Sequence, residues 1–130
     1  MDFVTGGTGL VGSHLIYDLL CAGNKVRALK RKNSNLKPIK NLFARNNKTS
    51  LFEEIEWVIG DINDIGGLLE HLEPVSRIFH CAALVSFNPR DKTKMELVNI
   101  TGTAIVVNAA IQLNIPELVY VSSTAAIGSQ

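Results

Sequence analysis

Several features that would assign this sequence to a special class of protein are scarce or missing. Its two cysteines, Cys21 and Cys81, are far apart, which excludes a disulfide framework and the close pairs of zinc or redox sites. We expect both to be reduced, packed thiols. No apolar run approaches the ~20 residues of a membrane-spanning helix. The net charge is only +1, so no overall field favours nucleic acid or an anionic membrane.

A signal for metal binding is also missing. The histidines, His14, His71 and His80, do not have the spacing of metal ligands, and we expect each to pack or to face solvent. Asp61 and Asp64 could also suggest a pair of catalytic carboxylates, but Asp64 stands where a residue would cap the following helix, so no such pair is expected. The sequence therefore predicts no metal site.

The composition that remains is that of an ordinary globular domain. The chain has 130 residues, of which 46% are hydrophobic and 19% charged, enough to form one hydrophobic core. It begins with a polar Asp2 and a glycine-rich segment instead of a signal peptide, which predicts a cytoplasmic protein.

Short apolar runs alternate with longer segments of helical periodicity. Strands joined in this way by helices pair in parallel through right-handed crossovers, so the order predicts an α/β fold with a parallel sheet. Five strands are expected, at residues 3–5, 26–29, 56–59, 77–81 and 118–121.

The predicted helices differ in how apolar they are. One follows the first strand and ends before Gly23. The segment 94–113 is so apolar that we expect a largely buried helix, which Pro116 follows. A short helix is expected over 65–72, and a surface helix within the polar and basic segment 34–50, where Leu36, Ile39, Leu42 and Phe43 have helical spacing.

Three glycines, each separated from the next by two residues, lie between the first strand and the first helix. Gly6 can form a tight turn, Gly9 lets a pyrophosphate approach the backbone, and Gly12 lets the helix close onto the sheet. The amides of Leu10 and Val11 would then face the phosphates. A glycine pattern in this strand-turn-helix context predicts a dinucleotide site in a doubly wound Rossmann-type sheet.

Five motifs in this order resemble the extended short-chain dehydrogenase/reductase family. They are the turn at residues 5–12, Asp61-Ile62, the segment His80-Cys81-Ala82-Ala83, Asn99 with Gly102-Thr103, and Val121-Ser122-Ser123-Thr124. The resemblance covers essentially the whole chain. It implies that Asp61 and Ile62 hold the adenine, and that Ala82 and Ala83 lie along the ribose.

The resemblance also assigns roles to the later motifs. It places Asn99 and Ser122 at the cofactor, and it implies that Ser123 or Thr124 supplies the hydroxyl that orients a substrate. A Ser pair at a strand end also commonly forms hydrogen bonds with loop backbone. The family often has Tyr directly before the following glycine, but Ile127 stands there, which weighs against a sugar-nucleotide epimerase.

The end of the second strand indicates which cofactor is preferred. Domains that prefer NAD place an acidic residue there, whereas this chain has Lys30-Arg31-Lys32. A guanidinium can pair with a 2′-phosphate through two charge-assisted hydrogen bonds. Arg31, assisted by Lys30 or Lys32, therefore predicts NADP, with NAD as the alternative.

The basic residues around this strand allow another interpretation. Nine of the thirteen lie between Lys25 and Lys48, a pattern that is also found in nucleic-acid-binding surfaces. Only Phe43 and Phe52 are near them, however, so the aromatic residues that stack bases are not interleaved with the charges. We expect no nucleic-acid partner, and a solvated surface for the charges beyond Lys32.

In the resembled family a Tyr-x-x-x-Lys pair transfers the proton at the substrate oxygen. This sequence does not contain that pair, which the family places after Ser123, so we interpret residues 1–130 as the amino-terminal, NAD(P)-binding part of a longer protein. The expected reaction is hydride transfer between the nicotinamide and a carbonyl or secondary alcohol, as in dihydroflavonol reductases or 3β-hydroxysteroid dehydrogenases. The alternatives are an NAD-dependent sugar-nucleotide epimerase or dehydratase and a non-catalytic NAD(P)-binding sensor. The expected partner is a small-molecule substrate, and the resemblance is compatible with a homodimer.

Overall fold

The structure, a computed structural model, describes residues 1–82 and 88–121. These residues contain one five-stranded parallel sheet with the strand order β3-β2-β1-β4-β5. The strands are β1 (Asp2–Thr5), β2 (Val26–Lys30), β3 (Glu56–Ile59), β4 (Arg77–His80) and β5 (Glu117–Tyr120). All five predicted strands are therefore confirmed, with bounds that differ by at most one residue at either end.

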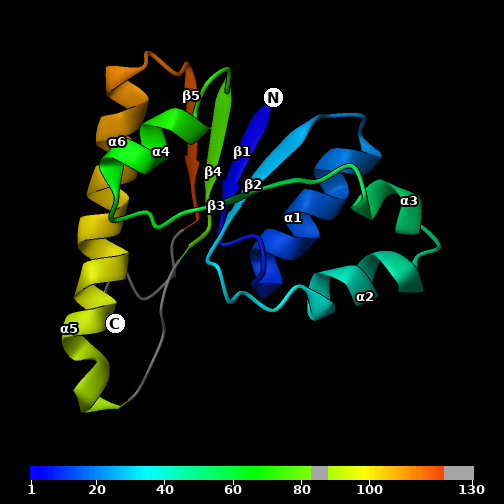
Figure 1. Cartoon of the computed structure of the whole chain (residues 1–130), viewed down its shortest axis with the longest axis horizontal. Coiled ribbons are helices and arrows are strands. Elements are labelled where there is room, and N and C mark those ends of the chain that lie inside the picture. Colours follow the sequence, from blue (N-terminus) through cyan, green and yellow to red (C-terminus); the bar gives the residue numbers. More distant parts are fainter. Residues whose placement is uncertain (83–87, 122–130) are drawn as a thin grey trace, which may run out of the picture.

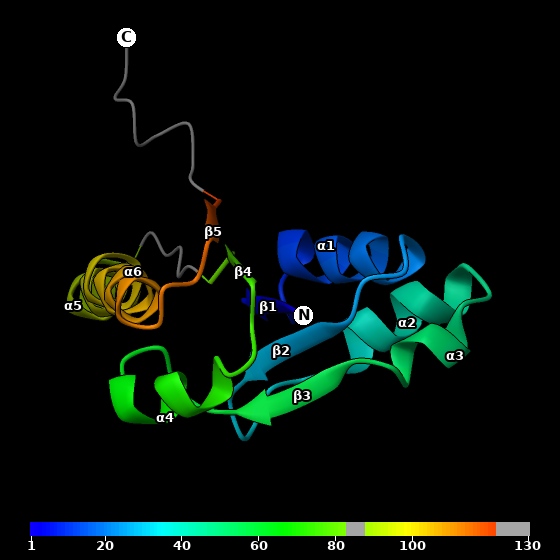
Figure 2. The ribbon, with the colours of Figure 1, turned by 90° about the horizontal axis from the view of Figure 1, so that it is seen from above.

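Helices cover both faces of the sheet, as Figures 1 and 2 show. On one face lie α1 (Leu10–Cys21), α2 (Lys37–Arg45) and α3 (Thr49–Phe52). On the other lie α4 (Ile65–His71) and a long helix made of α5 (Lys92–Glu96), the π-helical segment η2 (Leu97–Gly102) and α6 (Thr103–Gln112). A short 3-10 turn, η1 (Pro89–Asp91), precedes α5. The predicted doubly wound α/β fold is confirmed.

Alternation along the strands creates a separate core on each face. Phe3 and Ile78 pack with α4 and α6, whereas their neighbours Val4 and Phe79 pack with α1 and α2. Because successive side chains of a strand point to opposite faces, a fully buried strand such as β1 must be apolar on both. This explains why the middle residues of β1 and β4, Phe3-Val4 and Ile78-Phe79, are apolar, although each strand begins and ends with a polar residue.

The predicted helix over 34–50 is present as α2, and its expected apolar face is buried. Ile39, Leu42 and Phe43 are at most 6% exposed, and the Phe43 ring makes edge-to-face contacts with Tyr17 and Phe52. The helix that carries the positive charges of this segment is therefore packed against α1 through its apolar face.

The long helix over 92–112 is only partly buried, so the prediction of a largely buried helix is wrong. Val98, Gly102, Val106 and Ala109 face the core, while Leu97, Ile100 and Ile111 are 48%, 67% and 69% exposed. The helix covers one face of the sheet, and its opposite side has no described element over it. An apolar composition alone cannot distinguish these two sides.

The prediction of packed thiols is correct for one cysteine only. Both are free, but Cys21 is exposed at the end of α1, whereas Cys81 is half-buried after β4. A helix end at the surface leaves its last side chain in solvent even when the residue is apolar. None of the described helices is long and apolar enough to cross a membrane.

Candidate functional site

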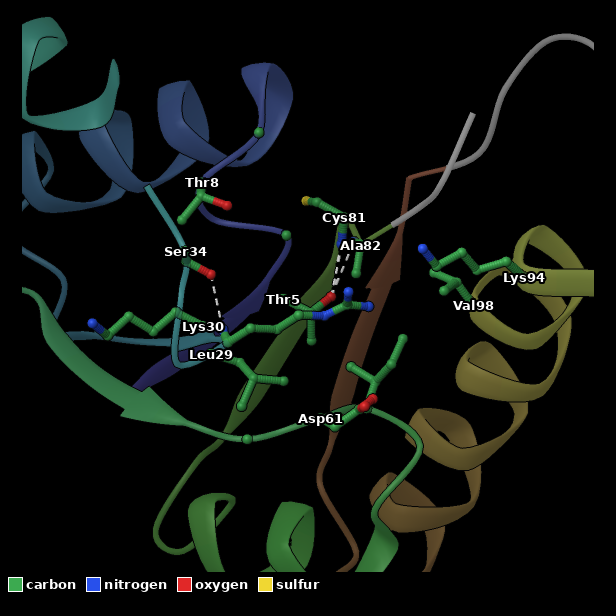
Figure 3. Close-up of a pocket in the computed structure, with 15 residues that line it drawn as sticks. Thr5, Thr8, Leu29, Lys30, Ser34, Asp61, Cys81, Ala82, Lys94 and Val98 are labelled. Carbon is green, nitrogen blue, oxygen red and sulfur yellow. Dashed lines mark hydrogen bonds between the residues drawn. The ribbon is translucent and has the colours of Figure 1, made fainter. Parts of the chain in front are cut away.

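A cavity of about 360 Å³ opens at the carboxyl ends of the strands, where the strand order reverses between β1 and β4. This is the place where doubly wound sheets bind ligands. Its walls come from the segments after β1, β2, β3 and β4 and from the long helix, and Figure 3 shows them converging. The lining residues are Thr5, Gly6, Thr8, Gly9, Leu29, Lys30, Arg31, Ser34, Gly60, Asp61, Ile62, Cys81, Ala82, Lys94 and Val98.

The glycine-rich turn forms the first wall, and Gly6 and Gly12 are required by its backbone. Gly6 has a φ of 69°, and a Cβ there would lie 2.6 Å from the amide nitrogen of Ala82. A Cβ on Gly12 would lie 2.0 Å from the carbonyl oxygen of Gly6. We expected Gly12 to allow close packing of the helix on the sheet. The structure shows that it allows close packing of the helix on the backbone of the glycine-rich turn instead.

Gly9 is different because the space beside its Cα is open. It precedes α1 in an extended conformation, and the nearest described atom that a Cβ there would meet, its chain neighbours aside, is the Gly6 oxygen at 3.4 Å. The amide of Ser13 donates the first helical hydrogen bond, to Gly9. The amides of Leu10, Val11 and Gly12 come before it and therefore have no acceptor within the helix. An anion beside Gly9 would meet these donors and the positive end of a 12-residue helix.

The second wall follows β2 and is basic. Lys30 and Arg31 line the cavity, while Lys32 is exposed and is not among the lining residues. The Arg31 amide donates to the Ser34 Oγ at 2.9 Å, and the Ser34 amide donates to the Arg31 carbonyl oxygen at 3.1 Å. This turn holds the Ser34 side chain at the cavity wall (Figure 3).

The third wall follows β3, where Asp61 and Ile62 have different roles. The Asp61 Oδ1 accepts a 2.9 Å hydrogen bond from the Asn63 amide, and Asp61 is exposed at the cavity. Ile62 is 5% exposed and packs against Gly102, where a Cβ would lie 2.4 Å from its Cδ1. Asp64 accepts from the Gly67 amide, which confirms it as the cap of α4.

The fourth wall, Cys81-Ala82, is attached to β1 by the Thr5 side chain. The amides of Cys81 and Ala82 each donate to the Thr5 Oγ1 at 3.1 Å. The same oxygen lies 2.6 Å from the Nδ1 of His80, whose Nε2 is 3.0 Å from the Thr103 Oγ1. Burial lowers the pKa of His80 and raises the pKa of the Cys81 thiol.

The structure brings together six of the predicted cofactor residues at this cavity: Gly6, Gly9, Arg31, Asp61, Ile62 and Ala82. Leu10, Val11 and Gly12 follow directly at the start of α1. Asn99 lies instead at a second hollow, which is lined by residues of the long helix such as Met95 and Ile100 and by the turn before it. Ala83, Ser122, Ser123 and Thr124 lie outside the described residues, so their predicted roles remain predictions.

Sequence reasoning missed other residues of the cavity. Thr5 and Thr8 lie next to glycines of the predicted phosphate-binding turn. Ser34 lies in the turn after β2, where its Oγ accepts a hydrogen bond from the Arg31 amide. Lys94 and Val98 are four residues apart and so share one helix face, and Figure 3 shows Lys94 extending from the helix toward the opposite walls. Among the described residues, no group of histidine, cysteine and acidic side chains could hold a metal ion.

Comparison with known proteins agrees with this geometry. A putative dihydroflavonol 4-reductase of Synechocystis is 39% identical over 126 residues, which are 97% of this chain and 33% of that protein. The X-ray structure of Pen from Bacillus thuringiensis superposes with a TM-score of 0.79 at 31% identity, covering 96% of this chain and 39% of that one. A short-chain dehydrogenase/reductase superfamily protein from Agrobacterium tumefaciens, solved with bound NAD, has a TM-score of 0.72 at 28% identity, covering 95% and 32%.

The chain thus spans about a third of the length of curated relatives that it matches. The family model that matches describes the 3-beta hydroxysteroid dehydrogenase/isomerase family, and the match extends over residues 3–130. The chain belongs to the 3-beta hydroxysteroid dehydrogenase/isomerase family.

Proposed function

We propose that residues 1–130 form the NAD(P)-binding part of an oxidoreductase that transfers hydride to or from a carbonyl or secondary alcohol, with NADP as the preferred cofactor. The observation that carries this proposal is the open side of Gly9 at the β1/β4 reversal, next to helix amides without helical acceptors. A pyrophosphate fits there because both the space and the donors are present.

The other walls suit the remaining parts of a dinucleotide. Asp61 and Ile62 would hold the adenine, and Ala82 with Ala83 would lie along a ribose. The family name and the dihydroflavonol 4-reductase relative support a carbonyl or secondary alcohol as the reacting group. When bound, the nicotinamide supplies or accepts the hydride. Asn99 and Ser122 remain proposed cofactor contacts, and Ser123 or Thr124 the proposed hydroxyl that orients the substrate.

The preference for NADP rests on the basic wall. Arg31 lines the cavity at the end of β2, its neighbour Lys30 does so too, and no acidic residue stands at the end of that strand. A guanidinium placed there stabilises a 2′-phosphate dianion, whereas NAD offers it only hydroxyl groups. Of the two lysines proposed to assist, the geometry favours Lys30 over Lys32.

Calorimetric titration with NADP and NAD tests the proposal. Arg31→Ala should weaken NADP binding by about 1 to 3 kcal/mol, the range for losing a charge-assisted hydrogen bond, and should change NAD binding little. Lys32→Ala is the matched control and should have the smaller effect on NADP. Equal affinities for both cofactors that do not change in Arg31→Ala would refute the NADP preference. If the unmodified protein binds neither NADP nor NAD, the proposed function itself is wrong.

A further inference from the structure

The contacts of the Thr5 hydroxyl determine where its proton is. A threonine hydroxyl has one hydrogen to donate and two lone pairs that accept. The amides of Cys81 and Ala82 donate to the two acceptor positions, each at 3.1 Å, and the Cys81 amide donates also to the Thr5 carbonyl oxygen at 3.2 Å. The third contact, 2.6 Å to the His80 Nδ1, must therefore be the one in which Thr5 donates. The His80 Nδ1 consequently carries no proton.

This assignment fixes the state of the whole imidazole ring. A ring without a proton on Nδ1 is neutral and carries its hydrogen on Nε2. The Nε2 then donates to the Thr103 Oγ1 at 3.0 Å. His80 is 1% exposed and Thr5 is fully buried, so water does not replace these partners. The ring of Tyr120 stacks on the imidazole with centroids 5.6 Å apart and further limits its rotation.

The network joins three elements at the edge of the cavity. Thr5 ends β1, His80 ends β4, and Thr103 begins α6. Through Thr5 the chain of hydrogen bonds ends on the amides of Cys81 and Ala82, two residues of the cavity wall. If the ring were protonated on Nδ1, that N–H would compete with the two amides for the two lone pairs of the Thr5 Oγ1, and one of the three donors would lose its acceptor.

We propose that His80 is a positioning residue of the cofactor cavity, which acts as the neutral Nε2–H tautomer and holds the Cys81-Ala82 wall through the Thr5 hydroxyl, with Thr103 as the group that selects this tautomer. The importance of that wall for the cofactor rests on the proposed function. The tautomer and the ordering of the wall do not, so they are measured without any nucleotide.

Nitrogen-15 NMR of the imidazole at pH 7.5 tests the tautomer in the unmodified protein. The expected spectrum of His80 has a protonated Nε2 and an unprotonated Nδ1. A ring protonated on Nδ1, or on both nitrogens, would overturn the proposal, and this result requires no variant to fold.

The positioning role is tested by a matched pair, Thr103→Val and Thr103→Ser. Serine keeps the acceptor for the Nε2–H, whereas valine has nearly the same shape without it. Amide exchange at Ala82 should be about 3- to 10-fold faster in Thr103→Val, as expected for the loss of one hydrogen bond, and near normal in Thr103→Ser. The effect at Cys81 should be smaller, because its amide donates also to the Thr5 carbonyl oxygen. The Asp2 amide, which donates to Lys25 at the other end of the sheet, is the internal control and should not change.

The affinity for NADP then tests whether the wall matters for the cofactor. Thr103→Val should weaken NADP binding by about 3- to 10-fold and Thr103→Ser should restore it. A lower melting temperature of Thr103→Val with unchanged exchange at Cys81 and Ala82 and unchanged affinity would show a merely structural role and overturn the proposal. If the unmodified protein binds no pyridine nucleotide, the proposed function fails, while the tautomer and the exchange data still decide the role of His80 in ordering the wall.

Discussion

A Cβ on Gly12 would lie 2.0 Å from the carbonyl oxygen of Gly6, whereas the corresponding Cβ on Gly9 would meet that oxygen at 3.4 Å. The two glycines of one turn thus serve different purposes. Gly12 lets α1 pack against the backbone of the turn, whereas a Cβ on Gly9 would not clash with any described residue.

This difference predicts opposite results for two alanine variants. Gly12→Ala should lower the free energy of unfolding by about 3 kcal/mol, because the backbone it meets cannot move aside cheaply. Gly9→Ala should change the free energy of unfolding by at most about 1 kcal/mol, because its extended backbone suits alanine but alanine is a poorer N-cap than glycine. It should nevertheless weaken nucleotide binding by about tenfold or more, since the Cβ fills the approach to the phosphates.

Urea unfolding and calorimetric titration of both variants provide the measurements. The assignment of Gly9 to the phosphate site would be wrong if Gly9→Ala bound NADP and NAD as tightly as the unmodified protein.

The two cysteines provide a chemical probe of the cavity. Cys81 lines it, whereas Cys21 is exposed at the far end of α1. NADP at ten times its Kd should slow alkylation of Cys81 by about tenfold, because only the unoccupied fraction reacts, and should leave Cys21 unchanged. Without nucleotide Cys81 should still be the slower of the two, since burial raises its pKa and reduces the reactive thiolate.

Mass spectrometry of peptides after alkylation with N-ethylmaleimide distinguishes the two sites. Equal protection of Cys21 and Cys81 would indicate a general stabilisation, and protection of neither would place the nucleotide elsewhere.

The sequence allowed prediction of those parts of the fold whose signals are local. The apolar runs of β1 and β4 and the cap at Asp64 depend on neighbouring residues, and the structure confirms them. The turn around Gly6 was predictable for the same reason, because a positive φ favours glycine wherever it occurs.

Features set by distant contacts could not be predicted. His80 contacts Thr5 and Thr103, which are 75 and 23 positions away in the sequence. No local sequence pattern predicts a hydrogen-bond network over such separations. Lys94 lines the cavity because the long helix packs on the sheet beside it, and the apolar composition of that helix does not indicate which of its faces is exposed. These residues can be recognised as part of the site only once the packed structure is known.

An ion pair at the amino-terminal end of the sheet should contribute to stability without affecting the cavity. The Arg77 guanidinium donates to both oxygens of Asp2, at 3.0 and 2.9 Å, and the Asp2 side chain is 7% exposed. This hydrogen bond raises the pKa of Arg77. Asp2→Asn should lower the free energy of unfolding by about 1 to 3 kcal/mol, because a two-point, charge-assisted contact is lost at a nearly buried site.

Glu117→Gln is the matched control, since its carboxylate is 65% exposed and 4.0 Å from the same guanidinium. We expect a change of less than about 0.5 kcal/mol, as for other exposed pairs. Urea unfolding of both variants measures the two changes in the free energy of unfolding. Equal changes in Asp2→Asn and Glu117→Gln would contradict the prediction that the Asp2–Arg77 pair is the stronger one.

The buried His80 should make stability depend on pH in a defined window. Burial lowers its pKa below the ordinary 6.5, so at intermediate pH the unfolded chain binds a proton that the folded chain does not. The stability from the neutral ring is therefore complete above about pH 6.5 and is lost as the pH falls from there toward the folded-state pKa.

The free energy of unfolding, measured from pH 7.5 to 5, should decrease by up to about 1.4 kcal/mol per pH unit within this window. His80→Gln removes the titrating ring and should flatten the curve, so that its deficit relative to the unmodified protein shrinks as the pH falls. His14→Gln, at an exposed position of α1, should leave the curve unchanged. Beside the ring, burial raises the pKa of the Cys81 thiol, away from this acidic range, so that thiol does not contribute to the slope. If the slope persists in His80→Gln and disappears in His14→Gln, the assignment of the slope to His80 is wrong.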